Sequence, residues 1–140
     1  MTTQAQPPVG RPIPTPDAAS QAFFDGAKAH KLLLRFCPAC SRWLAPASDA
    51  CDSCFSDQLE WKEASGKGEI YTFGIMHQVL HPGFKDEVPY NVVQVELAEG
   101  PRIMSNIVGT PNDQIKVGMK VEVMFDVLSP DVTVPKFKAI

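Results

Sequence analysis

The sequence has no long apolar segment and no excess of basic charge. No stretch approaches the about 20 consecutive apolar residues that a membrane-spanning helix needs, and residues 1–16 lack the apolar core of a secretory signal. We therefore expect a cytoplasmic protein without a membrane segment. The formal net charge of −3 gives no electrostatic reason to expect a nucleic-acid partner, because such partners reward clustered Lys and Arg.

Cysteine is scarce but strictly arranged. The four cysteines form two Cys-x2-Cys pairs separated by ten residues, namely Cys37, Cys40, Cys51 and Cys54. In a reducing compartment such pairs bind metal more often than they form disulfides. Four thiolates complete the tetrahedral shell of Zn²⁺ and leave no position open for water. We expect one structural Zn²⁺ per chain; the alternatives are iron in a rubredoxin-like site, redox-active dithiols, or disulfides.

The residue that follows each cysteine pair is not glycine. Glycine is frequent there because the backbone turns sharply after the second cysteine, whereas this chain has Ser41 and Phe55. The ligands are not affected by this difference. We expect slightly unusual backbone geometry at both turns.

Composition and periodicity divide the chain into three parts. Residues 1–16 are rich in Pro, Thr and Gln and are expected to form a flexible tail. Residues 17–64 are expected to hold a helix from 18 to about 30, with Asp17 as its N-cap, followed by a short strand and the cysteine ribbon. Residues 65–140 are expected to form a β-domain.

The β-domain is predicted from alternating apolar residues separated by turn signals. In the first strand, Tyr71, Phe73, Ile75 and Val79 are expected on the buried face. The five expected strands cover 69–79, 90–97, 102–108, 119–128 and 132–137. Five strands at this spacing favour a small barrel, and a barrel of the OB type fits best. Periodicity alone leaves an SH3-like barrel open.

Several segments, taken in order, resemble the DUF35 family of zinc-ribbon/OB-fold proteins. They are the helix with Phe-Phe, the four-cysteine ribbon, and then GKGEIYTFGIMHQVLHPGF, PYNVVQVELAEGPRIMSNIVG and VGMKVEVMF. The resemblance covers about residues 17–137. It implies a mainly β protein, with an N-terminal helix and rubredoxin-like zinc ribbon followed by a five-stranded OB-fold barrel.

The resemblance implies a role rather than a reaction. Family members act as small subunits beside thiolase-like catalytic subunits, such as a thiolase, an acyltransferase or an aldolase of steroid degradation. They support assembly and can help to hold the CoA part of the substrate. The expected partners are therefore a thiolase-like subunit in a hetero-oligomer and an acyl-CoA.

Two sets of residues are candidates for these contacts. Phe23 and Phe24 exceed what one face of a short helix can bury on a small ribbon, so they are candidates for the partner interface. A CoA site needs cations near an apolar wall. The candidate cations, expected to meet at one rim of the barrel, are Lys67, Lys85 and Arg102. The candidates for the apolar surface are Phe73, Phe84 and Tyr90.

Other functions are weighed against this one. We expect no catalytic residue in the chain, because all four cysteines serve as ligands and His30, His77 and His81 have no evident nucleophile to assist. A free-standing thioesterase or hydratase is therefore disfavoured. The remaining alternatives are a single-stranded nucleic-acid-binding module and a partner of a MaoC-like enoyl-CoA hydratase.

Overall fold

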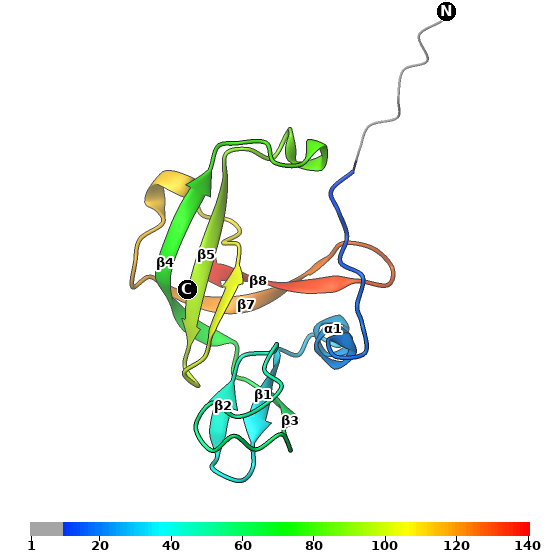
Figure 1. Ribbon diagram of the computed structural model, residues 1–140. Coiled ribbons are helices and arrows are strands. Elements are labelled where there is room, and N and C mark those ends of the chain that lie inside the picture. The colour runs from blue at the N-terminus through cyan, green and yellow to red at the C-terminus, as the bar shows by residue number, and fades with distance from the viewer. Residues whose placement is uncertain (1–9) are drawn as a thin grey trace, which may run out of the picture.

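The computed structural model describes residues 10–140, so residues 1–9 of the expected tail lie outside the described part (Figure 1). Within the described residues one α-helix, α1 (Gln21–Lys28), precedes eight strands, and two short 3₁₀ helices (Pro82–Phe84 and Asn112–Gln114) lie in loops between them. No helix within residues 10–140 is long and apolar enough to span a bilayer. The strands are β1 (Leu33–Cys37), β2 (Arg42–Leu44), β3 (Glu60–Glu63), β4 (Lys67–Met76), β5 (Tyr90–Leu97), β6 (Arg102–Ser105), β7 (Lys120–Val127) and β8 (Thr133–Ala139).

The strands form two antiparallel sheets, and in Figure 1 the sheet with β1, β2 and β3 lies below the larger one. A small sheet has the order β2-β1-β3, and a larger curled sheet has the order β6-β5-β4-β7-β8. A parallel bridge between Ile107 and Phe137 brings the two edges of the larger sheet together. This partly open five-stranded barrel is an OB fold. The predicted fold class is therefore confirmed.

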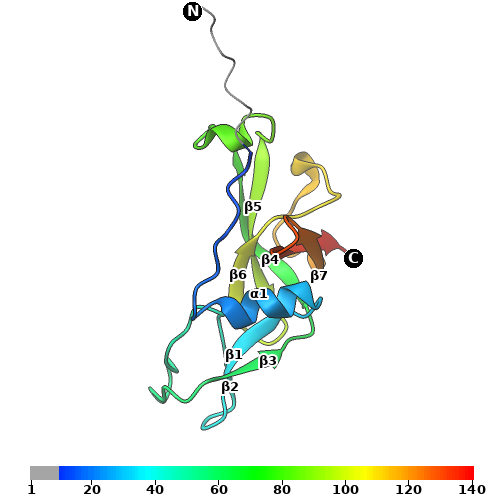
Figure 2. The same cartoon turned by 90° about the vertical axis from the view of Figure 1, so that its right-hand side faces the viewer.

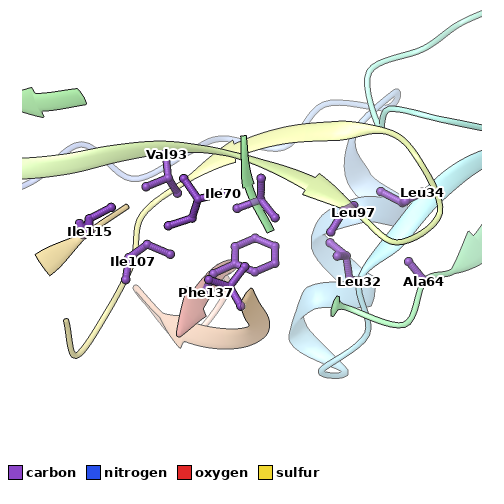
Figure 3. Packing of buried hydrophobic residues seen from close by; sticks show 11 residues of the cluster. Leu32, Leu34, Ala64, Ile70, Val93, Leu97, Ile107, Ile115 and Phe137 are labelled. Atoms are coloured by element: carbon purple, nitrogen blue, oxygen red, sulfur yellow. The ribbon is translucent and has the colours of Figure 1, made fainter. Parts of the chain in front are cut away.

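One apolar core joins the base of the small sheet to the inside of the barrel (Figure 3). Strand β5 alternates strictly, with Val93, Val95 and Leu97 buried as the sequence predicts. Phe137 of β8 is fully buried among them. From the small sheet, Leu32, Leu34 and Ala64 join the same cluster. The two sheets therefore share one packed interior.

The helix is shorter than the sequence predicts. Ser20, and not Asp17, is the N-cap residue of α1. The Asp17 carboxylate accepts a hydrogen bond from the Ser20 N–H (2.9 Å), and the backbone carbonyl of Asp17 accepts one from the Gln21 N–H (2.9 Å). Asp17 therefore closes a separate turn before the helix. At the other end His30 has a φ of 61°, a left-handed conformation that cannot continue a helix.

The expected burial pattern of β4 is wrong at Tyr71 and at Val79. A register shift between Ile70 and Thr72 adds one residue to the strand, so Ile70 is buried and Tyr71 is 46% exposed. A β-bulge of this kind breaks the alternation on which the prediction depends. Val79 lies beyond the end of β4 and is also exposed.

A buried asparagine fastens the barrel where its edges meet. The Asn91 amide donates to the Ile107 carbonyl (2.9 Å), and its Oδ1 accepts from the Ile107 N–H (2.7 Å). The Asn91 side chain thus pairs with both backbone groups of Ile107, as the backbone of a neighbouring strand would. Its loss would leave both groups of Ile107 without these partners, in a residue that is itself buried.

We expect Asn91→Ala to lower the free energy of unfolding by about 3 kcal/mol, because one buried donor and one buried acceptor lose their partners. Denaturant unfolding followed by circular dichroism measures the change. Gln94→Ala, on the same strand and half-buried, is the matched control. Equal stability of the two variants would contradict this role for Asn91.

Candidate metal centre

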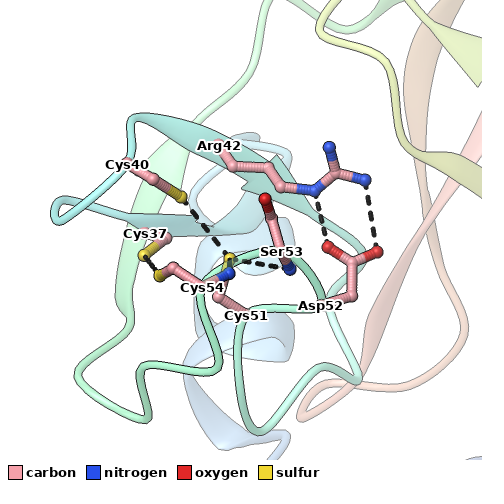
Figure 4. A network of polar contacts seen from close by, with 7 residues as sticks. All are labelled: Cys37, Cys40, Arg42, Cys51, Asp52, Ser53 and Cys54. Carbon is pink, nitrogen blue, oxygen red and sulfur yellow. Dashed lines mark hydrogen bonds and ion pairs between the residues drawn. The ribbon is translucent and has the colours of Figure 1, made fainter.

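The four cysteines converge at the tip of the small sheet (Figure 4). Cys37 ends β1, Cys40 lies in the turn to β2, and Cys51 and Cys54 lie in the loop between β2 and β3. Their four sulfurs all lie within 4.8 Å of one another. The Sγ–Sγ distances are 3.6 Å for Cys37 and Cys54, and 3.5 Å for Cys40 and Cys51.

This geometry fits a single Zn²⁺. A tetrahedral ion with Zn–S bonds of about 2.3 Å has its sulfurs about 3.8 Å apart, close to the two measured distances. Cys37 and Cys51 are buried, whereas Cys40 and Cys54 are exposed on the outer side. The donor set is four sulfurs, so a bound ion would have a closed shell and a structural role.

The backbone makes both sharp turns without glycine. Ser41 and Phe55 have φ values of 59° and 62°. Left-handed backbone costs a residue with a Cβ about 1–2 kcal/mol, which matches the unusual geometry expected at these positions. In the second cysteine pair, the N–H groups of Ser53 and Cys54 point to Cys51 Sγ at 3.4 and 3.5 Å.

The sulfurs differ in acidity. The backbone N–H groups of Cys54 and Ser53 lower the pKa of Cys51 to about 6, because they stabilise its thiolate. The hydrogen bond between Cys40 and Cys51 raises the pKa of the Cys40 thiol to about 12. A first thiolate therefore forms readily at Cys51. Arg42 and Asp52 form an ion pair beside it (2.6 Å), which links β2 to the second cysteine loop.

The tip of the ribbon has little apolar support apart from these cysteines. Its separate core consists of Cys37, Cys51 and Leu44, with Leu59 packed against them. Two of these four residues are candidate metal ligands. The order of the tip should therefore depend on the ion.

The partner-interface candidates Phe23 and Phe24 are half-buried on α1. Their rings meet edge to face, with centroids 5.5 Å apart. Phe23 packs against the main core. Both also line a groove, together with residues that the sequence did not suggest: Ile103, Met104 and Pro135. Ile103 and Met104 come from β6 and Pro135 from β8, so no local pattern in the sequence brings all three to α1.

The six CoA candidates do not meet at one rim, which corrects that part of the prediction. Lys67 and Arg102 lie at one end of the β4–β5 hairpin, whereas Phe84, Lys85 and Tyr90 lie at or beyond the other. Ten residues of β4, at about 3.3 Å per residue, separate the two ends by about 30 Å. Phe73 lies between them and packs against the core.

Each group has a local structure of its own. At the hairpin tip, the loop of residues 77–89 between β4 and β5, the ring of Phe84 lies against that of Tyr90. The centroids are 5.4 Å apart and the ring planes are tilted by 35°. Lys85, next to Phe84 in the chain, is exposed. At the opposite end the Arg102 guanidinium lies 3.5 Å from the Tyr71 ring centroid and pairs with Glu96 (2.9 Å).

The histidines occupy separate places. His30 stacks on Phe125 with ring centroids 5.2 Å apart. His81 Nδ1 accepts a hydrogen bond from the Gly83 N–H (2.9 Å) and so caps the short 3₁₀ helix Pro82–Phe84. His77 is exposed just after β4. His30 and His81 thus make local packing and capping contacts.

Comparison with known proteins identifies both halves of the chain. The model of the ChsH2 rubredoxin-like zinc ribbon domain matches residues 24–60, and that of the ChsH2 C-terminal OB-fold domain matches residues 61–126. A chain of a solved structure described as "Ltp2-ChsH2(DUF35) aldolase" superposes with a TM-score of 0.80 at 33% identity. The match covers 91% of this chain and 98% of that one.

Two curated relatives agree with this. A probable enoyl-CoA hydratase alpha subunit of Thermomonospora curvata is 35% identical over 136 residues, which is 97% of this chain but 42% of that protein. The chain thus spans less than half of that relative. A DUF35 domain-containing scaffold protein of Methanocaldococcus jannaschii is 32% identical over 96 residues, covering 68% of this chain and 67% of the relative. With its cysteine ribbon and OB barrel, the chain belongs to the DUF35 family.

Proposed function

We propose that this chain is the non-catalytic, zinc-binding subunit of a hetero-oligomeric acyl-CoA enzyme. In this proposal a thiolase-type subunit, which could be a thiolase, an aldolase or an acyltransferase, carries out the chemistry. The DUF35 chain supports assembly and helps to bind the CoA substrate. The site geometry is consistent with such a role, because four sulfur donors suit a structural ion.

One observation carries the proposal. Over 91% of its length, the chain superposes on a chain of the structure named "Ltp2-ChsH2(DUF35) aldolase". That name joins a DUF35 component and a second component, Ltp2, in one aldolase. The scaffold protein of M. jannaschii supports the same role by its name. The match to a probable enoyl-CoA hydratase alpha subunit favours a second candidate, in which the catalytic partner is a hydratase.

A nucleic-acid function has less support. Modules that bind single strands stack bases on accessible aromatic side chains in a positively charged groove. In the barrel, Phe137 is buried, and Phe73 and Phe125 pack against the core. These three rings are therefore engaged in packing.

An affinity pull-down of the tagged full chain from its native host, at physiological salt, tests the proposal. Mass spectrometry of the eluate and the mass of the complex in solution should show a stoichiometric partner with a thiolase fold. A hydratase-fold partner would favour the second candidate. Recovery of the chain alone, or with nucleic acid, would overturn the subunit proposal.

We also propose that the hairpin tip contacts the CoA part of the substrate, through Lys85 beside the Phe84–Tyr90 pair. Lys85→Glu should raise the KM of the complex for acyl-CoA about tenfold, since a charged hydrogen bond is worth about 1.5–3 kcal/mol. Lys67→Glu, at the far end of the hairpin, is the control. Steady-state kinetics that show no difference between the two variants would contradict this contact.

A further inference from the structure

The barrel is closed along only part of the boundary between β6 and β8. At one end the Phe137 N–H donates to the Asn106 carbonyl (3.0 Å), and the Val108 N–H donates to the Phe137 carbonyl (2.8 Å). Ser105 Oγ then donates to the Pro135 carbonyl (2.9 Å). Beyond Ser105 the strands separate, and a groove of about 420 Å³ opens between them and α1. In Figure 2, α1 crosses in front of the lower end of β6.

Strand β6 presents unused backbone groups to this groove. Within residues 10–140, its neighbour in the sheet is β5 alone. The Leu97 N–H donates to the Pro101 carbonyl, so the antiparallel alternation turns the backbone groups of Ile103 and Ser105 toward β5. Arg102 and Met104 therefore direct their N–H and C=O groups away from β5, toward the groove.

Strand β8, on the opposite side of the groove, has no backbone N–H to offer at Pro135. Pro135 has no N–H to donate, and its carbonyl already accepts the Ser105 hydroxyl. A strand entering the groove could thus pair with both N–H and C=O groups of β6, whereas Pro135 offers it no donor. The groove is therefore suited to a strand that pairs with β6 on one side and makes side-chain contacts on the other.

The walls of the groove define the chemistry of its occupant. Phe23, Phe24 and Ile103 make one part of the surface apolar, and Met104, beside the free edge, is 70% exposed. Among the described residues, the charged side chains that line the groove are two cations, Arg102 and Lys136. Their ion-pair partners, Glu96 and Asp126, do not line it. An occupant with apolar side chains and an acidic one complements this surface.

We propose that an extended segment of the catalytic subunit, apolar and carrying at least one acidic side chain, adds to β6 as an antiparallel strand in this groove. The proposal rests on the proposed function, because it assigns to that subunit a surface on this chain. A free exposed strand edge beside apolar side chains is a template for such pairing. The contact would involve two residues of β6, Arg102 and Met104.

The test uses the full chain and the catalytic subunit purified from the native complex. Met104→Pro removes the N–H that faces the groove and leaves the hydrogen bonds to β5 in place, whereas the control Met104→Val keeps that N–H. We expect Met104→Pro to weaken the Kd at least tenfold and Met104→Val to change it less than twofold. Phe24→Asp should also abolish co-purification, with zinc content unchanged and a cooperative unfolding transition retained in each variant.

Hydrogen exchange of the wild-type chain gives a second measurement that does not depend on the folding of a variant. Binding should slow exchange at residues 102–104. A complex that forms without this protection would overturn the groove proposal and leave the subunit proposal intact. Loss of binding in Phe24→Asp with an unchanged Kd in Met104→Pro would indicate that the catalytic subunit contacts side chains of the groove without pairing with β6, and would also overturn it. If no catalytic subunit co-purifies, the proposed function itself fails.

Discussion

Cys51→Ser should abolish stoichiometric zinc binding and unfold the tip of the ribbon. Cys51 is 1% exposed, and two backbone N–H groups point at its sulfur. A serine hydroxyl is a poor replacement for a thiolate ligand of Zn²⁺, so the closed shell would be broken. In zinc-finger peptides the ion contributes about 10–16 kcal/mol of apparent binding free energy, and this is also folding free energy.

The loss should be confined to the part of the ribbon farthest from the barrel. The tip has Leu44 and Leu59 as its remaining apolar support, whereas Leu32, Leu34 and Ala64 at the base pack with the barrel. We therefore expect fast hydrogen exchange at β2 and the cysteine loops, with slow exchange retained in β5. Incubating the wild-type chain with a strong zinc chelator should have the same effect.

Elemental analysis for zinc and hydrogen exchange measured by mass spectrometry check this prediction. Ser53→Ala is the matched control, because Ser53 is an exposed neighbour whose backbone N–H, and not its side chain, points to Cys51. It should bind one equivalent of zinc. A Cys51→Ser chain with full zinc content and a protected ribbon would show that the ion is not held as proposed.

Phe137→Ala should lower the free energy of unfolding by about 3–5 kcal/mol. The ring is fully buried where the barrel edges meet (Figure 3), and it is the largest of the fully buried side chains. The variant keeps the Phe137 backbone hydrogen bonds to residues 106 and 108, so the loss comes from packing and from the cavity left behind. Because total stability is about 5–15 kcal/mol, such a change is a large fraction of it.

Guanidinium unfolding monitored by circular dichroism measures this difference. Val127→Ala is the control, since Val127 lies on the neighbouring strand β7 and is 64% exposed. Exposed substitutions of this kind change stability by about 0.5 kcal/mol or less. If Phe137→Ala lost no more than the control, Phe137 would not be the centre of the core.

The elements that the sequence predicts correctly are those determined by local spacing. Two cysteine pairs bring four sulfurs together because each pair lies in one tight turn, and β5 has the predicted bounds because its alternation is unbroken. The alternation predicted for 119–128 fails at Val127, which is exposed at the end of β7. No partner covers that side chain among the residues described.

The features that the sequence does not predict depend on contacts between distant segments. The bulge after Ile70 leaves the Tyr71 side chain exposed, and no residue type in the sequence indicates a bulge there. The separation of Lys67 from Lys85 follows from the length of the β4–β5 hairpin and its antiparallel pairing. The groove beside Met104 needs α1, β6 and β8 in place at once.

The shared core has an evolutionary consequence. The boundary between the two matched domain models, after residue 60, falls at the first residue of β3, yet Leu32 and Leu34 before it pack in one cluster with the barrel. Recombination that exchanged the ribbon alone would join a new base to an old barrel and leave voids or clashes. Ribbon and barrel should therefore be inherited as a pair, with residues 32, 34 and 64 covarying with the barrel residues that they contact.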